Sequence, residues 1–325
     1  MSKFYSFLAQ DIEAFIAYRK KIGYTYDKYQ NMFTSFDRYI NEKQANLNDL
    51  TPNFFLKFRS TLSVEPETIN RMFVALRAFF EYLVRIERIS VNPLIDISAL
   101  KTKSYVPFVF STEQVESILQ VIARSIRSNS APVLLADLAI YSILSLMARC
   151  GLRISEPQRL RDEHYRKDEK TIYIKKTKFN KDRLIPLPDS VVTVIDNYLS
   201  VRNSIIDQQQ IPYLFTTSQG KVKSHSIYKT FHNALKNLKL DHLRYQVGNI
   251  TFGQPTPHSF RHSFAVNTLR LACEKGKNPE NVMPILAAYM GHTDYSYTIK
   301  YLKVLDAEHR NNWVDFCVFN KKDRQ

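Results

Sequence analysis

The chain has 325 residues, 44% of them hydrophobic, so it is long and apolar enough for two domains with separate cores, which excludes a wholly disordered chain. Its 46 basic residues exceed the 31 acidic ones by 15, and this net charge of +15 favours a polyanion as partner, although many soluble proteins are basic without binding nucleic acid. The three cysteines lie far apart and outside any Cys-x-x-Cys or Cys/His cluster, which excludes a disulfide framework and a zinc site.

The start of the chain favours a protein that is not secreted. Asp11 and Glu13 soon interrupt the first apolar residues, so the long apolar core of a signal peptide is missing. Elsewhere no apolar run approaches the ~20 residues that a transmembrane helix needs. We therefore expect a soluble, cytoplasmic protein.

Four amphipathic helices are predicted in the first hundred residues. Apolar residues recur at spacings of three and four over 7–24, and a second helix is expected around 28–41. Pro52 and Pro66 each occupy the first position of a further helix, and the last of these four helices extends to about Ile89.

The fourth predicted helix carries both core and basic residues. Its arginines are candidates for contacts with DNA phosphates, although a solvated basic face on an ordinary helical bundle explains them equally well. These arginines are Arg71, Arg77 and Arg85. The apolar positions expected to fill a core are Phe73, Leu76, Phe80 and Leu83.

A change in composition predicts a boundary between two domains. Residues 101–110 lose the helical periodicity and mix Lys, Ser and Pro, which is typical of a linker. We expect a helical domain over 1–100 and a second domain over 111–325, which opens with a capping box and contains a buried apolar helix over 131–150. Both sides are basic, with an excess of 15 − 11 = +4 in 1–110 and 31 − 20 = +11 in 111–325.

A short turn is predicted directly after the buried helix. Gly151 can end that helix, and Ser155 with Gln158 can cap the next one, so Arg153 lies on a turn tied to two rigid elements. A guanidinium fixed in this way suits two oxygens of a phosphate. The alternative is an ion pair between Arg153 and Glu156.

One β-hairpin is predicted, with strands within 171–176 and 182–187. Lys178 and Lys181 lie at its tip, where they can enter a DNA groove or deliver a proton. Lysines at a hairpin tip are also commonly just solvated.

The segment Thr256 to His262 predicts a helix start with Pro257 at the first position, so His258 and Arg261 share one face of the first turn. The dipole and free N–H groups of a helix start also favour an anion there. We expect His262 to point elsewhere, and an ordinary capped helix start remains the alternative.

The stretch from Gly291 to Tyr301 pairs a Gly-His corner with a tyrosine nine residues after His292. Pro279 can start the helix that leads into this corner, and apolar spacing after it predicts a further helix that carries Tyr301. A phenol is a weak nucleophile at its free pKa near 10 and needs a proton acceptor and nearby cations. The alternative is a tyrosine that only packs.

Taken in order, the four motifs resemble the tyrosine site-specific recombinase (phage integrase) family. They are Gly-Leu-Arg-Ile-Ser-Glu, a hairpin lysine 25 residues after its arginine, His-x-x-Arg-His, and Gly-His with a tyrosine nine residues later. The resemblance implies a mainly α-helical fold with a small β-hairpin or sheet. It further implies a C-shaped clamp on DNA, made of a SAM-like core-binding domain (1–100) and an α+β catalytic domain (111–325).

The resemblance also implies a nucleoid-associated protein and a reaction that uses no metal and no other cofactor. Tyr301 would attack a phosphodiester, giving a 3′-phosphotyrosine intermediate and a free 5′ hydroxyl. Arg153 and Arg261 would hold the non-bridging oxygens. Lys178 would protonate the leaving 5′ oxygen, with Lys181 as the alternative because Phe179 replaces the small residue usual after the family's hairpin lysine.

The remaining site residues follow from the same resemblance. His258 would assist Tyr301 in proton transfer, His292 would hydrogen-bond the phosphate, and Glu156 would hold the site together. The implied catalytic set is Arg153, Lys178, His258, Arg261, His292 and Tyr301.

The implied partners are double-stranded DNA recombination sites, further copies of the chain in a tetrameric synapse, and an accessory directionality protein. The apolar tail after Tyr301 would dock in trans on a neighbouring subunit or pack on its own domain. The expected role is integration, excision or resolution of a mobile element. The alternatives are Xer-like resolution of chromosome or plasmid dimers, a type IB topoisomerase and a non-catalytic DNA-binding regulator.

Overall fold

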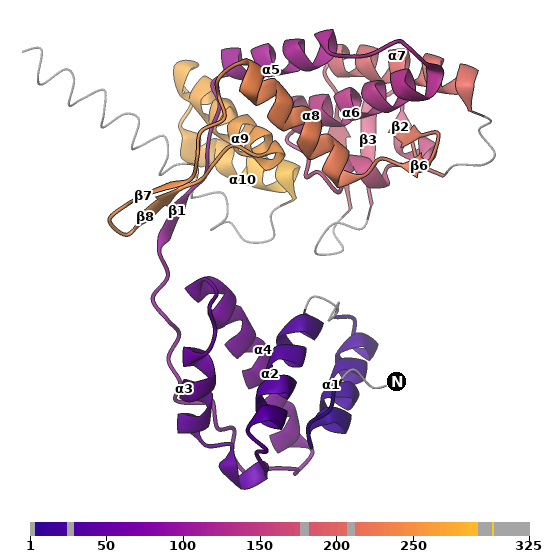
Figure 1. Cartoon of the computed structure of the whole chain (residues 1–325). Coiled ribbons are helices and arrows are strands. Elements are labelled where there is room, and N and C mark those ends of the chain that lie inside the picture. The colour runs from indigo at the N-terminus through magenta and orange to yellow at the C-terminus, as the bar shows by residue number, and fades with distance from the viewer. Residues whose placement is uncertain (1–3, 25–28, 176–181, 207–211, 292–300, 302–325) are drawn as a thin grey trace, which may run out of the picture. The chain divides into compact units, whose positions relative to one another are not determined.

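The computed structural model describes residues 4–24, 29–175, 182–206, 212–291 and 301. The chain divides into two compact units, unit 1 (1–103) and unit 2 (104–325). Figure 1 shows that helices dominate both units and that the strands belong to unit 2.

The described part of unit 1 is helical. All four predicted helices are confirmed, although the last one ends four residues before Ile89. Their bounds are α1 (Ala9–Lys21), α2 (Gln30–Glu42), α3 (Pro52–Ser60) and α4 (Pro66–Arg85), with the short 3-10 helix η2 (Leu47–Asp49) before α3.

Phenylalanines from several helices form the core of unit 1. The rings of Phe36, Phe55 and Phe58 are buried, and the Phe36 centroid lies 5.6 Å from that of Phe55 and 5.4 Å from that of Phe58. Such aromatic pairs stabilise a core beyond the area that they bury. The α4 side chains that were predicted to fill this core, Phe73, Leu76, Phe80 and Leu83, are all buried.

Unit 2 is built around α6. Its helices are α5 (Thr112–Arg124), α6 (Ala131–Cys150), α7 (Asp189–Ile205), α8 (Ser224–Asn237), α9 (Pro257–Glu274) and α10 (Pro279–Met290), with the 3-10 helices η3 (Pro157–Arg159) and η4 (Asp162–His164). Ser111 caps α5 in the predicted capping box with Gln114. Helix α6 contacts α5, α7, α8 and α9, as a central core helix does.

Helix α6 is the one helix of the described residues whose length and composition would allow it to cross a membrane. Its side chains nevertheless line the core of unit 2, where Leu144 and Met147 are fully buried. The expectation that no apolar segment approaches that length is therefore wrong for α6, because core packing requires the same apolar composition.

The predicted hairpin is confirmed and belongs to a three-stranded antiparallel sheet. Strand β3 (Thr171–Ile174) pairs with β4 (Arg183–Pro186) so that Ile174 lies opposite Arg183, and β2 (Tyr165–Arg166) pairs with the other edge of β3. Two further sheets were not predicted. They comprise β5 (Thr216–Thr217) with β6 (Gly220–Lys221), and β1 (Ser104–Val106), which runs parallel to β8 (Ile250–Phe252), with β7 (Tyr245–Val247) on the other side of β8.

Candidate active site

The turn after α6 holds Arg153. Gly151 ends α6 with a φ of 61°, a left-handed conformation that glycine adopts without strain, and a Cβ there would lie 2.5 Å from the ring of Phe264. The main-chain N–H of Arg153 donates to Glu156 Oε2 (2.8 Å), and its guanidinium Nη1 donates to Oε1 (3.1 Å). The expected pair with Glu156 therefore exists. It orients Arg153 and leaves 22% of the arginine side chain exposed.

The expectation that Ser155 and Gln158 cap a following helix is wrong. The chain forms only the three-residue η3 at this point. The Gln158 amide instead donates to the main-chain oxygen of Val222 (2.9 Å) and to Ser224 Oγ (3.1 Å). These partners lie more than sixty residues away in sequence, so the local motif could not reveal them.

Glu156 is buried and joins the turn to the hairpin. Arg183 of β4 donates to both carboxylate oxygens, through Nη1 to Oε1 (3.1 Å) and Nη2 to Oε2 (2.9 Å), and through Nε to the main-chain oxygen of Tyr289 (2.8 Å). Burial alone would raise the pKa of Glu156, but the hydrogen bonds and charge of Arg183 outweigh it and hold that pKa below its ordinary value.

Arg183 is a site residue that the sequence analysis missed. Its side chain is only 9% exposed. The available signal was strand alternation, which places Arg183 on the same face of β4 as the buried Ile185. An arginine on the core-facing side of a strand needs partners for its buried charge, and here the main one is the Glu156 carboxylate.

Helix α9 supplies the second arginine. It begins at Pro257 as predicted, and His258 and Arg261 lie on its first turns. The Arg261 side chain is 1% exposed and donates through Nη1 to the main-chain oxygen of Gly151 (2.6 Å) and through Nη2 to that of Met290 (2.6 Å). Arg261 therefore connects the C-terminal ends of α6 and α10.

These helix ends explain how a guanidinium can be buried here. The last carbonyls of a helix carry partial negative charge and favour a cation. Burial and the neighbouring charge of Arg153 lower the pKa of Arg261 to about 9, which leaves the group charged at neutral pH.

Arg153 also reaches the end of α10. This helix begins at Pro279 as predicted and ends at Gly291, whose φ is 65°. Arg153 donates to the main-chain oxygens of Met290 (3.4 Å) and Gly291 (3.3 Å), and the Arg183 guanidinium lies 2.9 Å from where a Cβ of residue 291 would be. Three guanidinium groups thus converge on the end of α10.

Tyr301 lies in the same region. Its side chain is 4% exposed and belongs to the apolar cluster that includes Leu269 and Met290. Its hydroxyl lies 3.0 Å from Nδ1 of His262. The expectation that His262 points elsewhere is therefore wrong. The residue was overlooked because only its long-range contact with Tyr301 reveals its direction.

The titration of the tyrosine and the neighbouring histidine follows from burial. Burial raises the pKa of Tyr301, while the charges of Arg261 and Arg153 oppose that rise. Burial, followed by the same two charges, lowers the pKa of His258 to about 4, so this imidazole is neutral at pH 7. The His258 and His262 rings meet edge to face, with centroids 4.7 Å apart.

Three candidates lie outside the described residues. Lys178 and Lys181 belong to the hairpin tip, 176–181, and His292 begins the stretch 292–300. Their roles as general acid, DNA contact and phosphate ligand therefore remain predictions. Within the described part of the chain, no group of three or more His, Cys, Asp or Glu side chains is arranged to hold a metal ion.

The arginines of α4 separate into two kinds. Arg77 is half-buried and donates through Nε to the main-chain oxygen of Leu94 (3.3 Å) and through Nη2 to that of Ile97 (2.9 Å). The Arg77 guanidinium therefore holds the segment that follows α4, and its predicted contact with DNA stays a prediction. Arg71 and Arg85 are exposed and stay candidates for DNA contacts.

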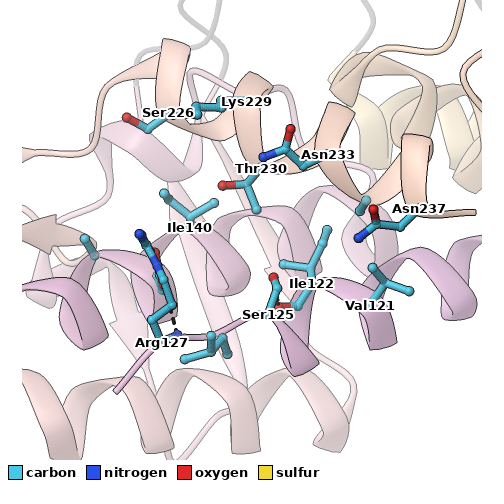
Figure 2. A pocket seen from close by; sticks show the side chains of 14 residues that line it. Val121, Ile122, Ser125, Arg127, Ile140, Ser226, Lys229, Thr230, Asn233 and Asn237 are labelled. Carbon is cyan, nitrogen blue, oxygen red and sulfur yellow. Dashed lines mark hydrogen bonds and ion pairs between the residues drawn. The ribbon is translucent and has the colours of Figure 1, made fainter. Parts of the chain in front are cut away.

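A separate hollow of about 630 Å³ lies between α5, α6 and α8 (Figure 2). Its polar lining includes Lys229 and Asn233 on α8 and the pair of Arg127 and Asp137. Arg127 donates to both carboxylate oxygens of Asp137 at 2.9 Å, so this pair is satisfied internally. None of the described lining residues is a tyrosine, histidine or cysteine, so this hollow offers no counterpart to the pair of Tyr301 and His262 at the arginine cluster.

Comparisons with known proteins connect this geometry to a family. A sequence profile of the phage integrase family matches residues 109–308, and a profile of the phage integrase SAM-like domain matches residues 4–99. The tyrosine recombinase XerC of Alcanivorax borkumensis is 31% identical over 245 residues, which cover 75% of this chain and 70% of that protein.

Solved structures share the fold. The XerH site-specific recombinase bound to difH substrate in a pre-cleavage complex superposes with a TM-score of 0.64 at 16% identity, over 86% of this chain and 77% of that one. The Tn1549 transposon integrase in complex with a circular intermediate DNA superposes with a TM-score of 0.60 at 18% identity, over 93% and 98%. The predicted mainly helical fold with small sheets is confirmed.

Proposed function

This chain belongs to the phage integrase family of tyrosine recombinases, enzymes of site-specific DNA recombination, and we propose that it breaks and rejoins DNA through a covalent bond to Tyr301. The observation that carries this assignment is the shared target of two arginines. Arg153 and Arg261, from distant segments, both donate to the main-chain oxygen of Met290, and Tyr301 belongs to the same apolar cluster as that residue. Two directed cations and a protected phenol therefore meet in one place.

This arrangement supports attack on a phosphodiester. As Tyr301 Oη bonds to phosphorus, negative charge grows on the non-bridging oxygens, and fixed donors such as Arg153 and Arg261 stabilise it. Glu156 keeps Arg153 and Arg183 in place without neutralising the whole cluster, because one carboxylate faces three guanidinium groups.

The products are a 3′-phosphotyrosine and a free 5′ hydroxyl. The leaving 5′ oxygen needs a proton, which we assign to Lys178, with Lys181 as the alternative. The energy of the phosphodiester is kept in the bond to Tyr301, so rejoining requires no nucleotide cofactor. We assign to His292 a hydrogen bond to the phosphate.

The substrate that we propose is a pair of double-stranded DNA recombination sites, held in the cytoplasm by a tetramer of this chain. The likeness to recombinases solved on DNA supports the DNA partner. The tail after Tyr301 lies outside the described residues. Its apolar side chains, which we propose dock on a neighbouring subunit, are Val304, Leu305, Trp313, Val314, Phe316, Val318 and Phe319.

For the biological role we propose integration, excision or resolution of a mobile element, with an accessory directionality protein. The likeness to the Tn1549 transposon integrase over 93% of this chain supports that role. The identity with XerC supports the alternative of chromosome or plasmid dimer resolution. The DNA beside the gene separates the two, since a transposon end or attachment site favours the first and a chromosomal replication locus the second.

The chemistry is tested with a nicked suicide duplex. The duplex would carry a site selected from random DNA by its binding to the protein, and its nick would let the cut fragment diffuse away. We expect wild type to form a denaturation-resistant adduct, and Tyr301→Phe to bind the duplex without forming it. Site-specific binding by wild type with no adduct on any selected site would favour the non-catalytic regulator instead.

A further inference from the structure

We propose that His262 is the general base that takes the proton of Tyr301 during cleavage. This inference rests on the proposed function. The sequence analysis assigned proton transfer from Tyr301 to His258, and the structure favours His262 for that role. The imidazole that the structure places at the tyrosine hydroxyl is that of His262, with Nδ1 and Oη 3.0 Å apart. That distance lies within the reach of direct proton transfer.

The local fold fixes this contact. His262 follows Arg261 directly on α9, and the same helix holds Arg261 against the ends of α6 and α10. The edge-to-face contact with His258 supports the His262 ring from the preceding turn. The base and the two phosphate-binding arginines are therefore parts of one rigid arrangement.

The charges around the tyrosine assist the transfer. Arg261 and Arg153 face Tyr301 and stabilise its phenolate, while Glu156 is occupied by Arg153 and Arg183. His258 packs against the His262 ring, whereas His262 places a ring nitrogen at hydrogen-bond distance from Tyr301 Oη. The low pKa of His258, about 4, also makes it a poor base.

The proposed step conserves protons and charge. His262 starts with its proton on Nε2, so that Nδ1 accepts from Tyr301 Oη. The bond from Oη to phosphorus forms, the bond from phosphorus to the 5′ oxygen breaks, and the general acid gives that oxygen its proton. In rejoining, the 5′ hydroxyl attacks phosphorus and gives its proton back to the general acid. The bond to Oη breaks, and the proton on Nδ1 returns to the tyrosine.

The test compares His262→Asn with His262→Ala in the full-length protein, using single-turnover cleavage of the nicked suicide duplex. Asparagine places a polar atom near the position of Nδ1, so it can hold the hydroxyl, but it cannot take the proton. We expect both variants to bind DNA normally and to cleave about 10²–10⁴-fold more slowly than wild type. Free imidazole should restore part of the rate to His262→Ala.

The pH profile separates a base from a positioning residue. The cleavage rate of wild type should fall at low pH as the base becomes protonated. This fall should be absent from His262→Asn and present in His258→Asn. Cleavage by His262→Asn within a few-fold of wild type, or an unchanged acid limb in that variant, would overturn the proposal. Failure of the wild type to form any adduct would instead overturn the proposed function.

Discussion

The arginines around α10 and those on α4 differ in what they contact. Arg153, Arg183 and Arg261 are buried or partly buried and donate to helix-end carbonyls or to Glu156, whereas Arg71 and Arg85 are exposed. A guanidinium fixed by several partners can direct its remaining donors at one phosphate. An exposed arginine contributes mainly charge, which attracts DNA without choosing an atom.

Arg77 belongs to neither group. It is on the same helix as the exposed arginines, yet its donors are used by the main chain at Leu94 and Ile97. A basic residue on a predicted DNA-facing helix can therefore be structural. Only the partners of the guanidinium show whether such a residue contacts DNA or supports the fold.

The largest loss of cleavage rate is expected for Lys178, a lysine at the hairpin tip. Lys178→Ala should cleave an ordinary suicide duplex about 10²–10⁴-fold more slowly, because the leaving oxygen lacks its acid. A 5′-phosphorothiolate duplex, whose sulfur leaves without protonation, should restore the rate. If the phosphorothiolate duplex restored cleavage to Lys181→Ala but not to Lys178→Ala, the general acid would be Lys181.

Arg153 tests whether the fixed arginines act in the reaction or only in the fold. Arg153→Ala should lower the single-turnover cleavage rate about 10²–10³-fold while DNA affinity changes little, because the donor acts on charge that grows in the transition state. Arg166→Ala removes an exposed arginine paired with Glu169 and serves as the control. Equal rate losses in both variants would contradict a directed role for Arg153.

Glu156 tests what holds the arginine cluster together. Glu156→Gln should lower the free energy of unfolding by about 3 kcal/mol at pH 7, because it leaves buried guanidinium groups without their anion. Because the folded pKa of Glu156 lies below its ordinary value near 4.3, this stabilisation is present above that value and is lost as the pH falls through the folded pKa. The free energy of unfolding, measured by urea denaturation at a series of pH values, should therefore fall less steeply at acid pH in the variant than in wild type.

The matched control is Glu169→Gln, which weakens an exposed pair with Arg166 and should change little. A similar loss of stability in both variants would mean that Glu156 has no special part in the cluster.

The smallest effects are expected on α4. Arg71→Ala and Arg85→Ala should each weaken DNA binding and reduce the slope of log K against log salt by about 0.9 if the residue contacts one phosphate. Arg77→Ala should leave that slope unchanged and instead destabilise unit 1 by about 1–3 kcal/mol, because two main-chain oxygens lose a charged donor. A smaller slope of log K against log salt for Arg77→Ala would show instead that Arg77 contacts a phosphate.

Local signals allowed much of the fold to be predicted. Pro66, Ser111 and Pro257 mark helix starts through interactions within one turn, so the sequence suffices to place them. The pairing of β1 with β8 could not be predicted, because it joins segments about 150 residues apart. The same limit applies to Gln158, whose partners lie on a distant segment.

The candidate site shows the same division. The sequence identified Arg153 and Arg261 through motifs, but it did not reveal that both donate to Met290. Arg183 and His262 were missed because their roles depend on partners that only folding brings near. Motif spacing identifies which residues can react, and tertiary contacts decide what each one touches.

Tyr301 is the proposed nucleophile at the arginine cluster. The direct measurement is to digest the adduct trapped on the nicked suicide duplex and to locate the nucleotide-bearing residue by mass spectrometry. We predict that the peptide is modified at Tyr301 and that Tyr301→Phe yields no modified peptide. Modification of Tyr295 or Tyr297 instead would contradict the assignment.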